Sequence, residues 1–148
     1  MSAAGNGAII LTIPDAPVLL VNAPLITRSI QIGITWSAGA TNGGTPVIDY
    51  RINFDYGTDV FSIDVAGITS TTYTKTGLTA GITYKFKVEA RNALGYSDYS
   101  SAVAILTAQE PATPIAPITS VIGLYVRIAW TASSTNGSPI TKYQIQIR

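Results

Sequence analysis

The sequence predicts an all-β protein built as a sandwich of two antiparallel sheets. Short segments in which apolar and polar residues alternate are separated by Gly, Asn and Pro at roughly the 8–12-residue spacing that is typical of such folds. We find no segment of helical length with an apolar stripe at a period of about 3.6 residues. The strand pattern also recurs farther along the chain, which indicates tandem copies of one domain.

The internal repeat rests on four landmarks whose spacings lie between 93 and 97 residues. The paired landmarks are Trp36 with Trp130, Tyr50 with Tyr143, PDAP at 14–17 with PATP at 111–114, and ILT at 10–12 with ILT at 105–107. The Trp and Tyr pairs belong to a longer match between residues 29–52 and 125–145. A spacing this constant predicts tandem domains of about 95 residues.

The repeat divides the chain into three parts. Residues 1–13 are predicted to hold the last strand of a preceding repeat, 14–108 one complete domain, and 109–148 the first three strands of a following repeat. The opening MSAAGNGAII lacks the basic region and the long apolar region of a signal peptide. We therefore expect either that export information was removed or that the sequence is a piece of a longer protein.

The first half of the complete copy contains three predicted strands. A strand at 17–22 follows two prolines, which cannot donate to a β-ladder. The strand at 29–36 places four apolar residues on one face: Ile30, Ile32, Ile34 and Trp36. After the turn-forming ATNGGTP loop, the strand at 47–55 alternates Tyr50, Ile52 and Phe54 with polar residues.

The second half contains four more predicted strands, at 59–65, 71–76, 83–91 and 100–107. The alternation at 59–65 leaves open which of its two sets faces inward. In 83–91 the alternation is strict: Tyr84, Phe86, Val88 and Ala90 are interleaved with Lys85, Lys87, Glu89 and Arg91. Because successive side chains of a strand point to opposite faces, we expect the apolar set to face the core and the charged set to face solvent.

These landmarks resemble the fibronectin type III family. The landmarks are Pro14 and Pro17, Trp36, Asn42 to Pro46, Tyr50, LTAG at 78–81, Tyr84, Phe86, Val88, Ala90, Asn92, Gly95 and Ser97. The resemblance covers nearly all of 14–108 and the first three strands of 111–148. It implies a seven-stranded immunoglobulin-like sandwich in which Tyr84 is a tyrosine corner, a buried ring whose hydroxyl bonds to backbone a few residues upstream.

The resemblance also implies a set of structural core residues. They are Trp36, Tyr50, Leu78, Tyr84, Phe86 and Val88 in the complete copy, and Trp130 and Tyr143 in the following one. The loop between the last two predicted strands, RNALGYSDYS, lacks the Arg-Gly-Asp tripeptide that is found in integrin ligands. Tyr96 and Tyr99 in it are candidate contact residues, since aromatic side chains concentrate binding energy, although a role in covering the end of the sandwich is the simpler interpretation.

The composition argues against most enzyme classes. The chain has no Cys and no His, which removes cysteine nucleophiles, histidine-based triads and the commonest zinc ligands. The carboxylates Asp49, Asp55, Asp59, Asp64 and Glu89 cluster in sequence, but a sandwich supplies no evident cleft for paired-carboxylate chemistry. Calcium at a domain junction would have only Asp15 and Glu110 as ligands. We therefore predict no catalytic, cofactor-binding or metal residues, and no cofactor.

The charge balance also bears on partners. A net charge of +1 provides no electrostatic basis for binding nucleic acid, and no run approaches the roughly 20 apolar residues of a membrane-spanning helix. Only 11% of residues are charged. The surface is therefore either rich in Thr and Ser or covered by neighbouring domains, partner chains or sugar. One sequon, Asn136-Gly137-Ser138, is a candidate glycosylation site, although Pro139 follows it and Asn-Gly is also a turn signal.

The leading hypothesis is a non-enzymatic structural or adhesive module of a tandem-repeat protein that is extracellular, at the cell surface or part of a filament. Its partners would be neighbouring repeats of the same protein or the other subunits of a homopolymer, with no nucleic acid and no membrane insertion. One alternative is an accessory linker domain of a secreted carbohydrate-active enzyme. Another is an intracellular giant-protein array, whose loops TNGGTPVIDY resembles.

Overall fold

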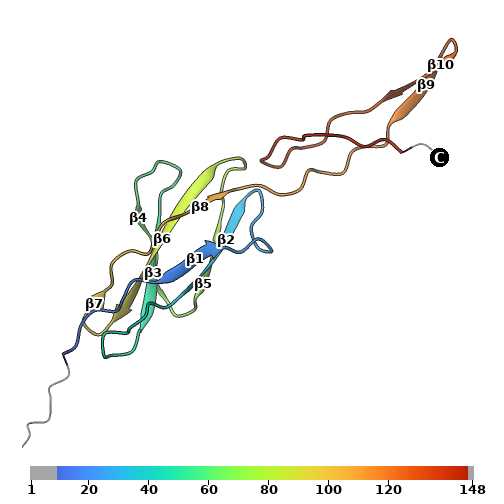
Figure 1. Ribbon diagram of the computed structural model, residues 1–148. Coiled ribbons are helices and arrows are strands. Elements are labelled where there is room, and N and C mark those ends of the chain that lie inside the picture. The colour runs from blue at the N-terminus through green and yellow to red at the C-terminus, as the bar shows by residue number, and fades with distance from the viewer. Residues whose placement is uncertain (1–9, 147–148) are drawn as a thin grey trace, which may run out of the picture.

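A computed structural model describes residues 10–146 of the chain (Figure 1). The described residues form strands, turns and loops, which confirms the predicted all-β class. The strands are β1 (Val18–Asn22), β2 (Gln31–Ser37), β3 (Asp49–Phe54), β4 (Ser62–Ile68), β5 (Thr72–Thr76), β6 (Thr83–Asn92), β7 (Gly95–Tyr96), β8 (Val103–Leu106), β9 (Ile118–Ile122) and β10 (Tyr125–Ala129).

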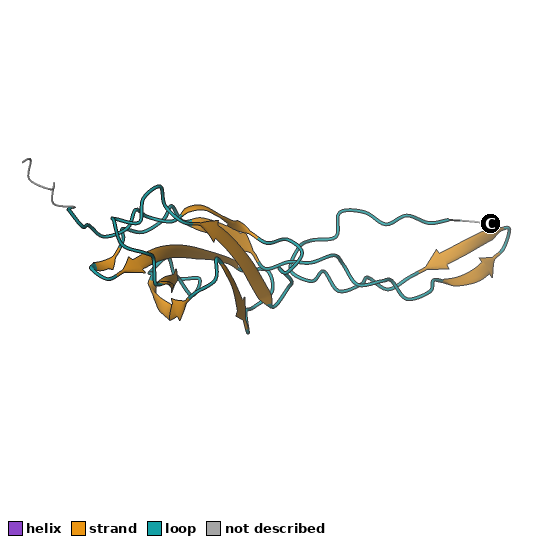
Figure 2. Cartoon of the chain, turned by 90° about the horizontal axis from the view of Figure 1, so that it is seen from below, coloured by secondary structure: helices purple, strands orange, loops and turns teal. Residues whose placement is uncertain are grey.

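The first eight strands form a two-layer sandwich. One sheet has the order β1-β2-β5, and the other has the order β4-β3-β6-β7, with β8 also paired to β6. Neighbouring strands are antiparallel throughout. The remaining strands, β9 and β10, form a separate antiparallel hairpin at the end of an extended arm that leads away from the sandwich (Figures 1 and 2).

The core lies between the two sheets because each strand turns its alternate apolar residues inward. Its buried members are Ile32, Ile34, Trp36, Tyr50, Ile52, Phe54, Leu78, Tyr84, Phe86, Val88, Ala90 and Ile105. Trp36 of β2 meets Tyr50 of β3 edge to face, with ring centroids 5.4 Å apart. Phe54 packs against Phe86 at 4.8 Å, so aromatic pairs lie both across and within the layers.

Tyr84 joins the start of β6 to the turn that precedes it. Its ring is buried and lies 5.3 Å from the ring of Phe54. Its hydroxyl accepts a hydrogen bond from the backbone N–H of Thr79 at 3.1 Å. The side chain therefore has the geometry of a tyrosine corner, with the ring in the core and the hydroxyl bonded to backbone five residues upstream.

Two of our expectations about side-chain exposure are wrong. Ile30 is 60% exposed, because it lies in a tight turn closed by the pairing of Arg28 with Gln31 and β2 begins only after it. Glu89 points to the outer face of its sheet as expected, yet it is only 5% exposed. Side chains from the adjacent strand β3 cover its carboxylate, and alternation along one strand does not report such neighbours.

The predicted strand bounds differ most at 59–65, where β4 begins only at Ser62. Residues 56–59 form a turn instead. The carboxylate of Asp55 accepts the backbone N–H of Gly57 at 3.0 Å, and the carbonyl of Asp55 accepts that of Thr58 at 2.9 Å. These local bonds compete with strand pairing and delay the start of β4.

The predicted flanking copies are only partly formed as strands. Residues 1–9 lie outside the described part, and 10–13 run beside the loop at 41–43 without strand assignment. In the arm, β9 and β10 form two of the three predicted strands, but the described residues after Pro139 are irregular.

The predicted core role of Trp130 and Tyr143 is also wrong for this chain. Their rings pack together with centroids 5.7 Å apart, yet Trp130 is 44% and Tyr143 39% exposed. The physical reason is that no described segment of the arm corresponds to β4, β5 and β6, the strands that complete the sandwich around Trp36 and Tyr50.

Replacement of Trp36 by alanine tests its role in the core. We expect Trp36→Ala to lower the free energy of unfolding by about 3–5 kcal/mol, through lost apolar burial and a residual cavity. Denaturant titration measures this loss. Trp130→Ala is the matched control, because Trp130 is the counterpart in the repeat and is half exposed; it should leave the midpoint of the same transition within error. Equal effects of the two substitutions would contradict the assignment.

Removal of the Tyr84 hydroxyl tests the bond to Thr79. We expect Tyr84→Phe to cost about 1–3 kcal/mol, because the N–H of Thr79 loses its acceptor in a part-buried hydrogen bond while the aromatic ring remains. Thermal unfolding monitored by circular dichroism reports the change. Tyr99→Phe, at an exposed ring, is the control and should leave the melting temperature unchanged. An unaltered melting temperature in Tyr84→Phe would show that this hydrogen bond contributes nothing.

Candidate contact surfaces

A network of charged and polar side chains covers the outer face of the second sheet. Arg51 of β3 and Glu89 of β6 are direct cross-strand partners. The guanidinium of Arg51 donates from Nε and Nη2 to the two carboxylate oxygens of Glu89, each at 2.7 Å. Nδ2 of Asn53 donates to the same carboxylate at 2.7 Å. The hydrogen bond to Glu89 raises the pKa of Arg51, and the three donated hydrogen bonds engage both oxygens of the buried carboxylate.

The neighbouring pair on the same face repeats the arrangement. Arg91 of β6 lies directly opposite Asp49 of β3. Its Nε donates to Oδ1 of Asp49 at 2.9 Å, and its Nη2 donates to Oδ2. The hydrogen bond to Asp49 raises the pKa of Arg91. Two members of the charged row of β6, Glu89 and Arg91, are therefore neutralised by partners on β3, whereas Lys85 pairs with Asp59 and Lys87 lies against aromatic rings.

The two predicted contact tyrosines lie at the edge of this network, in different environments. The guanidinium of Arg51 sits 3.8 Å from the ring centroid of Tyr96, so that tyrosine is held in place by a cation–π contact. Tyr99 is 52% exposed, and Nζ of Lys87 lies 5.2 Å from its ring. Phe61 completes the group, 4.3 Å from the same ammonium. Tyr96 is thus structural, whereas Tyr99, Lys87 and Phe61 form an open aromatic patch.

The clustered carboxylates serve local structure. Oδ1 of the buried Asp55 accepts the backbone N–H of Lys85 at 2.9 Å. Asp64 accepts hydrogen bonds from Tyr73 at 2.7 Å and from Lys75. Burial acts to raise the pKa of Asp64, but the hydrogen bonds from Lys75 and Tyr73 outweigh it and hold that pKa below its ordinary value. Asp59 forms an ion pair with Lys85 at the surface.

Within residues 10–146 no three His, Cys, Asp or Glu side chains gather in a group that could hold a metal ion. Each of the two acidic residues at the junctions takes part in a local hydrogen bond. Asp15 accepts the N–H of Thr41 through Oδ2 at 3.0 Å, whereas Glu110 contributes its backbone carbonyl to Asn136. In the same described part, no helix is long and apolar enough to cross a membrane.

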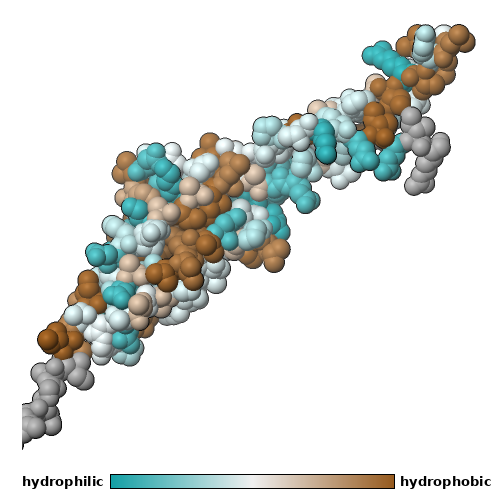
Figure 3. Space-filling view, viewed as in Figure 1, coloured by the Kyte–Doolittle hydropathy of each residue, from teal (hydrophilic) through white to brown (hydrophobic). Residues whose placement is uncertain are grey.

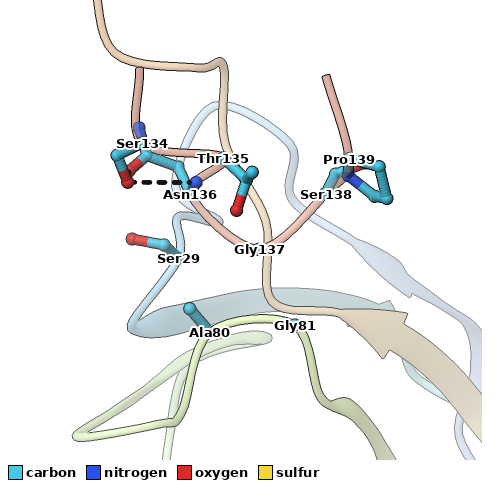
Figure 4. Close-up of a pocket in the computed structure, with 9 residues that line it drawn as sticks. All are labelled: Ser29, Ala80, Gly81, Ser134, Thr135, Asn136, Gly137, Ser138 and Pro139. Atoms are coloured by element: carbon cyan, nitrogen blue, oxygen red, sulfur yellow. Dashed lines mark hydrogen bonds between the residues drawn. The ribbon is translucent and has the colours of Figure 1, made fainter. Parts of the chain in front are cut away.

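A second surface lies where the arm meets the sandwich. The loop at residues 134–139, which we call the junction loop, lies directly over the turn at residues 79–81, which we call the receiving turn (Figure 4). Between them is a shallow groove lined also by Ser29. Asn136, the candidate glycosylation residue, lies in this loop. Its side-chain Nδ2 donates to the carbonyl of Glu110 at 2.7 Å, so the atom that would carry a glycan is engaged in the turn.

A third surface is the hairpin of the arm, which is apolar and exposed. Figure 3 shows hydrophobic residues gathered over β9 and β10. The exposed large side chains there are Ile118, Val121, Ile122, Leu124, Tyr125 and Val126. Both faces of a two-stranded hairpin are open to solvent, and such a concentration of apolar area is typical of a surface that another element covers. The internal repeat of the sequence could have indicated this apolar surface, because it aligns Val126 with Ile32, which is buried in the complete domain.

Comparison with known proteins places the fold in a family. The family model described as Fibronectin type III domain matches residues 18–105. A Kelch domain-containing protein of Saccharolobus solfataricus is 36% identical over 68% of this chain and 13% of its own length. Exoglucanase B of Cellulomonas fimi is 32% identical over 90% of this chain and 13% of its own length. The chain thus spans about an eighth of the length of these relatives.

Solved structures agree at the level of fold. The crystal structure of titin domains A168–A170 superposes with a TM-score of 0.58 at 23% identity, covering 64% of this chain and 32% of that one. A human fourth FNIII domain gives a TM-score of 0.59 at 20% identity and covers 72% of this chain and 88% of its own. Together with the match of the family model over most of the sandwich, these results establish that the chain belongs to the fibronectin type III family.

Proposed function

We propose that this chain is a non-catalytic spacer and contact module of a tandem-repeat protein. Residues 14–108 form its complete domain, and 1–13 and 109–148 belong to neighbouring repeats. The observation that carries the proposal is the contrast between equivalent residues. Trp36 is buried in a closed core, whereas Trp130, at the same place in the repeat, is half exposed in the arm.

The contrast extends along the matching strands. The repeat aligns Ile32 and Ile34 of β2 with Val126 and Ile128 of β10. The first two are fully buried between the sheets, while Val126 is exposed and Ile128 only partly covered. A hairpin with this much exposed apolar surface gains free energy when further strands cover it. Strands equivalent to β4–β6 of the same repeat are the surface that its sequence is suited to meet.

The contacts of the charged side chains support a non-catalytic role. Each carboxylate that the sequence offered for acid–base chemistry is bonded within the fold: Asp49, Asp55, Asp59, Asp64 and Glu89. Relatives with names as different as a Kelch domain-containing protein and an exoglucanase share this module over about an eighth of their length. A module that recurs in such different proteins is expected to supply architecture rather than chemistry.

A second candidate function is an accessory linker in a secreted carbohydrate-active enzyme. It is favoured by 32% identity to Exoglucanase B of Cellulomonas fimi and by 30% identity to Chitinase A1 of Niallia circulans, each over 90% of this chain. On either view we place the module outside the cell or at its surface, with neighbouring domains of the same protein or the other subunits of a homopolymer as partners. The two candidates differ in whether a catalytic domain lies elsewhere in the same gene.

Hydrogen exchange on the 148-residue chain tests the proposal. At micromolar concentration, with a monomer verified by light scattering, we expect slow exchange in β2, β3 and β6 and fast exchange in β9 and β10. The reason is that each strand of the first group has a paired strand on both edges and the core against one face, whereas the hairpin has no covering layer. The equivalent strands β2 and β10 are the internal control. Strong protection of β10 in a monomer would contradict the proposal, because the arm would then be stable without a neighbour.

A further inference from the structure

The junction loop and the receiving turn make a built contact between the arm and the sandwich. We propose that the Asn-Gly tip of each repeat docks on the turn equivalent to 79–81 of the repeat before it, and that this contact fixes the angle between consecutive repeats. The inference deepens the proposed function, since it names the surface through which neighbours meet. The contact itself lies within this chain and is measurable on it.

Thr107 anchors the sandwich side of the contact. The residue is fully buried, although it lies at the end of the domain. Its hydroxyl lies 2.6 Å from the carbonyl oxygen of Thr79 and accepts the N–H of Ile82 at 3.2 Å. Its carbonyl oxygen accepts the N–H of Gly81 at 2.8 Å. The chain therefore leaves the domain at Thr107, whose side chain and backbone are both hydrogen-bonded to residues 79–82.

The junction loop is bonded to the linker that follows Thr107. The N–H of Gln109 donates to the carbonyl of Asn136, and the N–H of Ala112 donates to that of Ser134, both at 3.1 Å. The Asn136 side chain adds its bond to the carbonyl of Glu110. Three hydrogen bonds thus hold the linker against the loop, so these two segments of the arm form one local unit.

Glycine at position 137 allows the two sides to meet. Gly137 lies against Gly81 at the closest point of the contact (Figure 4). A Cβ atom added at Gly137 would lie 2.3 Å from the carbonyl oxygen of Thr107 and 2.9 Å from the nitrogen of Gly81, both of which are backbone atoms. Its φ of +97° is also unfavourable for other residues. Even the smallest side chain there must push the loop off the sandwich.

The same contact occurs a second time, at the other end of the domain. The N–H groups of Thr12 and Asp15 donate to the carbonyls of Gly43 and Thr41, at 2.9 and 3.0 Å. The donors are three residues apart in the linker and the acceptors two apart in the loop, as in the pair of bonds made by Gln109 and Ala112. A Cβ atom at Gly43 would lie 2.1 Å from the carbonyl oxygen of Thr12.

The close approach of the glycine aligns in the repeat: Gly43 corresponds to Gly137 and Thr12 to Thr107, at spacings of 94 and 95 residues. The hydrogen bonds are shifted along the chain, because Thr12 and Gly43 bond as Gln109 and Asn136 do, at spacings of 97 and 93 residues. The sites also differ in burial: the side chain of Thr107 is buried against the receiving turn, and that of Thr12 is exposed. Thr12 and the tip at Asn42 and Gly43 therefore present the surface that fits a copy of the turn at 79–82.

The docking end of the complete domain, formed by Thr12 and the tip at Asn42 and Gly43, is held in place by Asn92. Asn92 is buried, and its Nδ2 donates both to the carbonyl of Thr12 at 2.8 Å and to that of Asn42 at 2.9 Å. Its Oδ1 accepts the N–H of Leu94 at 2.9 Å. One side chain of the complete domain thus holds the incoming linker and the tip together. A preorganised surface of this kind lowers the entropic cost of docking.

Nuclear magnetic resonance on the full 148-residue chain tests the proposal. We expect nuclear Overhauser contacts between the α protons of Gly137 and the amide of Gly81. Residual dipolar couplings from 107–112 and 134–138 should fit the alignment tensor of β2, β3 and β6. Gly137→Ala should abolish the contacts and the common fit while leaving the spectrum of the sandwich intact. Gly123→Ala is the matched control, since Gly123 also has positive φ but nothing lies near its added Cβ.

A wild-type chain in which residues 134–138 align independently of the sandwich would overturn the proposal, as would a Gly137→Ala chain that keeps the common alignment. Gly43→Ala probes the second site, where we expect the amides of Thr12 and Asp15 to lose exchange protection; unchanged protection of both would also count against the inference. The proposed function fails separately. The proposed function would be wrong if the parent protein carried no further repeats, even with a rigid junction. Repeats joined by freely rotating linkers would overturn only the inference about the junction.

Discussion

The structure depends on closing two sheets over the contact between Trp36 and Tyr50. The edge-to-face contact of these rings joins β2 of one sheet to β3 of the other, and the apolar row of β6 completes the layer beneath them. The arm offers a natural comparison, because Trp130 and Tyr143 also pack together. They remain half exposed, so the aromatic pair does not by itself make a core. Burial requires the later strands of the same repeat, which makes the repeat the cooperative unit.

The strands of the complete domain could be predicted because one face of each strand packs in the core and the other face points outward. A strand with one face in the core must alternate, and residues 83–91 alternate without exception. Glu89 could not be predicted as buried, because its cover comes from Arg51 and Asn53 on β3. Cross-strand register depends on the whole sheet and is not encoded in the periodicity of one segment. Ile30 was misplaced for a related reason, since alternation does not reveal where a tight turn ends a strand.

The sequence predicts the turns at the junction between arm and sandwich but not the contact that they make. The Asn-Gly pairs at 42–43 and 136–137 predict turns, and they recur at the repeat spacing. What alternation and turn rules cannot supply is the partner of a turn, because the contact between Gly137 and Gly81 joins residues far apart in the chain through backbone atoms alone. The repeat contained a usable signal, however. A glycine follows Ile-Leu-Thr in both copies, 31 residues after Thr12 and 30 residues after Thr107, which is the pattern expected of a contact that excludes side chains.

The outer face of the second sheet and the junction between arm and sandwich are held together by different kinds of contact. On the outer face of the sandwich, Arg51 and Arg91 meet their carboxylates across strands, so a surface that carries charge presents little of it to a partner. At the junction, the contacting groups are mostly backbone amides, carbonyls and glycines, with Asn136 as the polar side chain that completes them. Such a contact is neutral and depends on salt far less than an exposed ion pair does. It also places few demands on the remaining side chains, so the proposed docking would leave the outer positions of the module free to vary. In the proposed array such modules would join through their ends, which leaves their faces available for other contacts, including the open patch of Tyr99, Lys87 and Phe61.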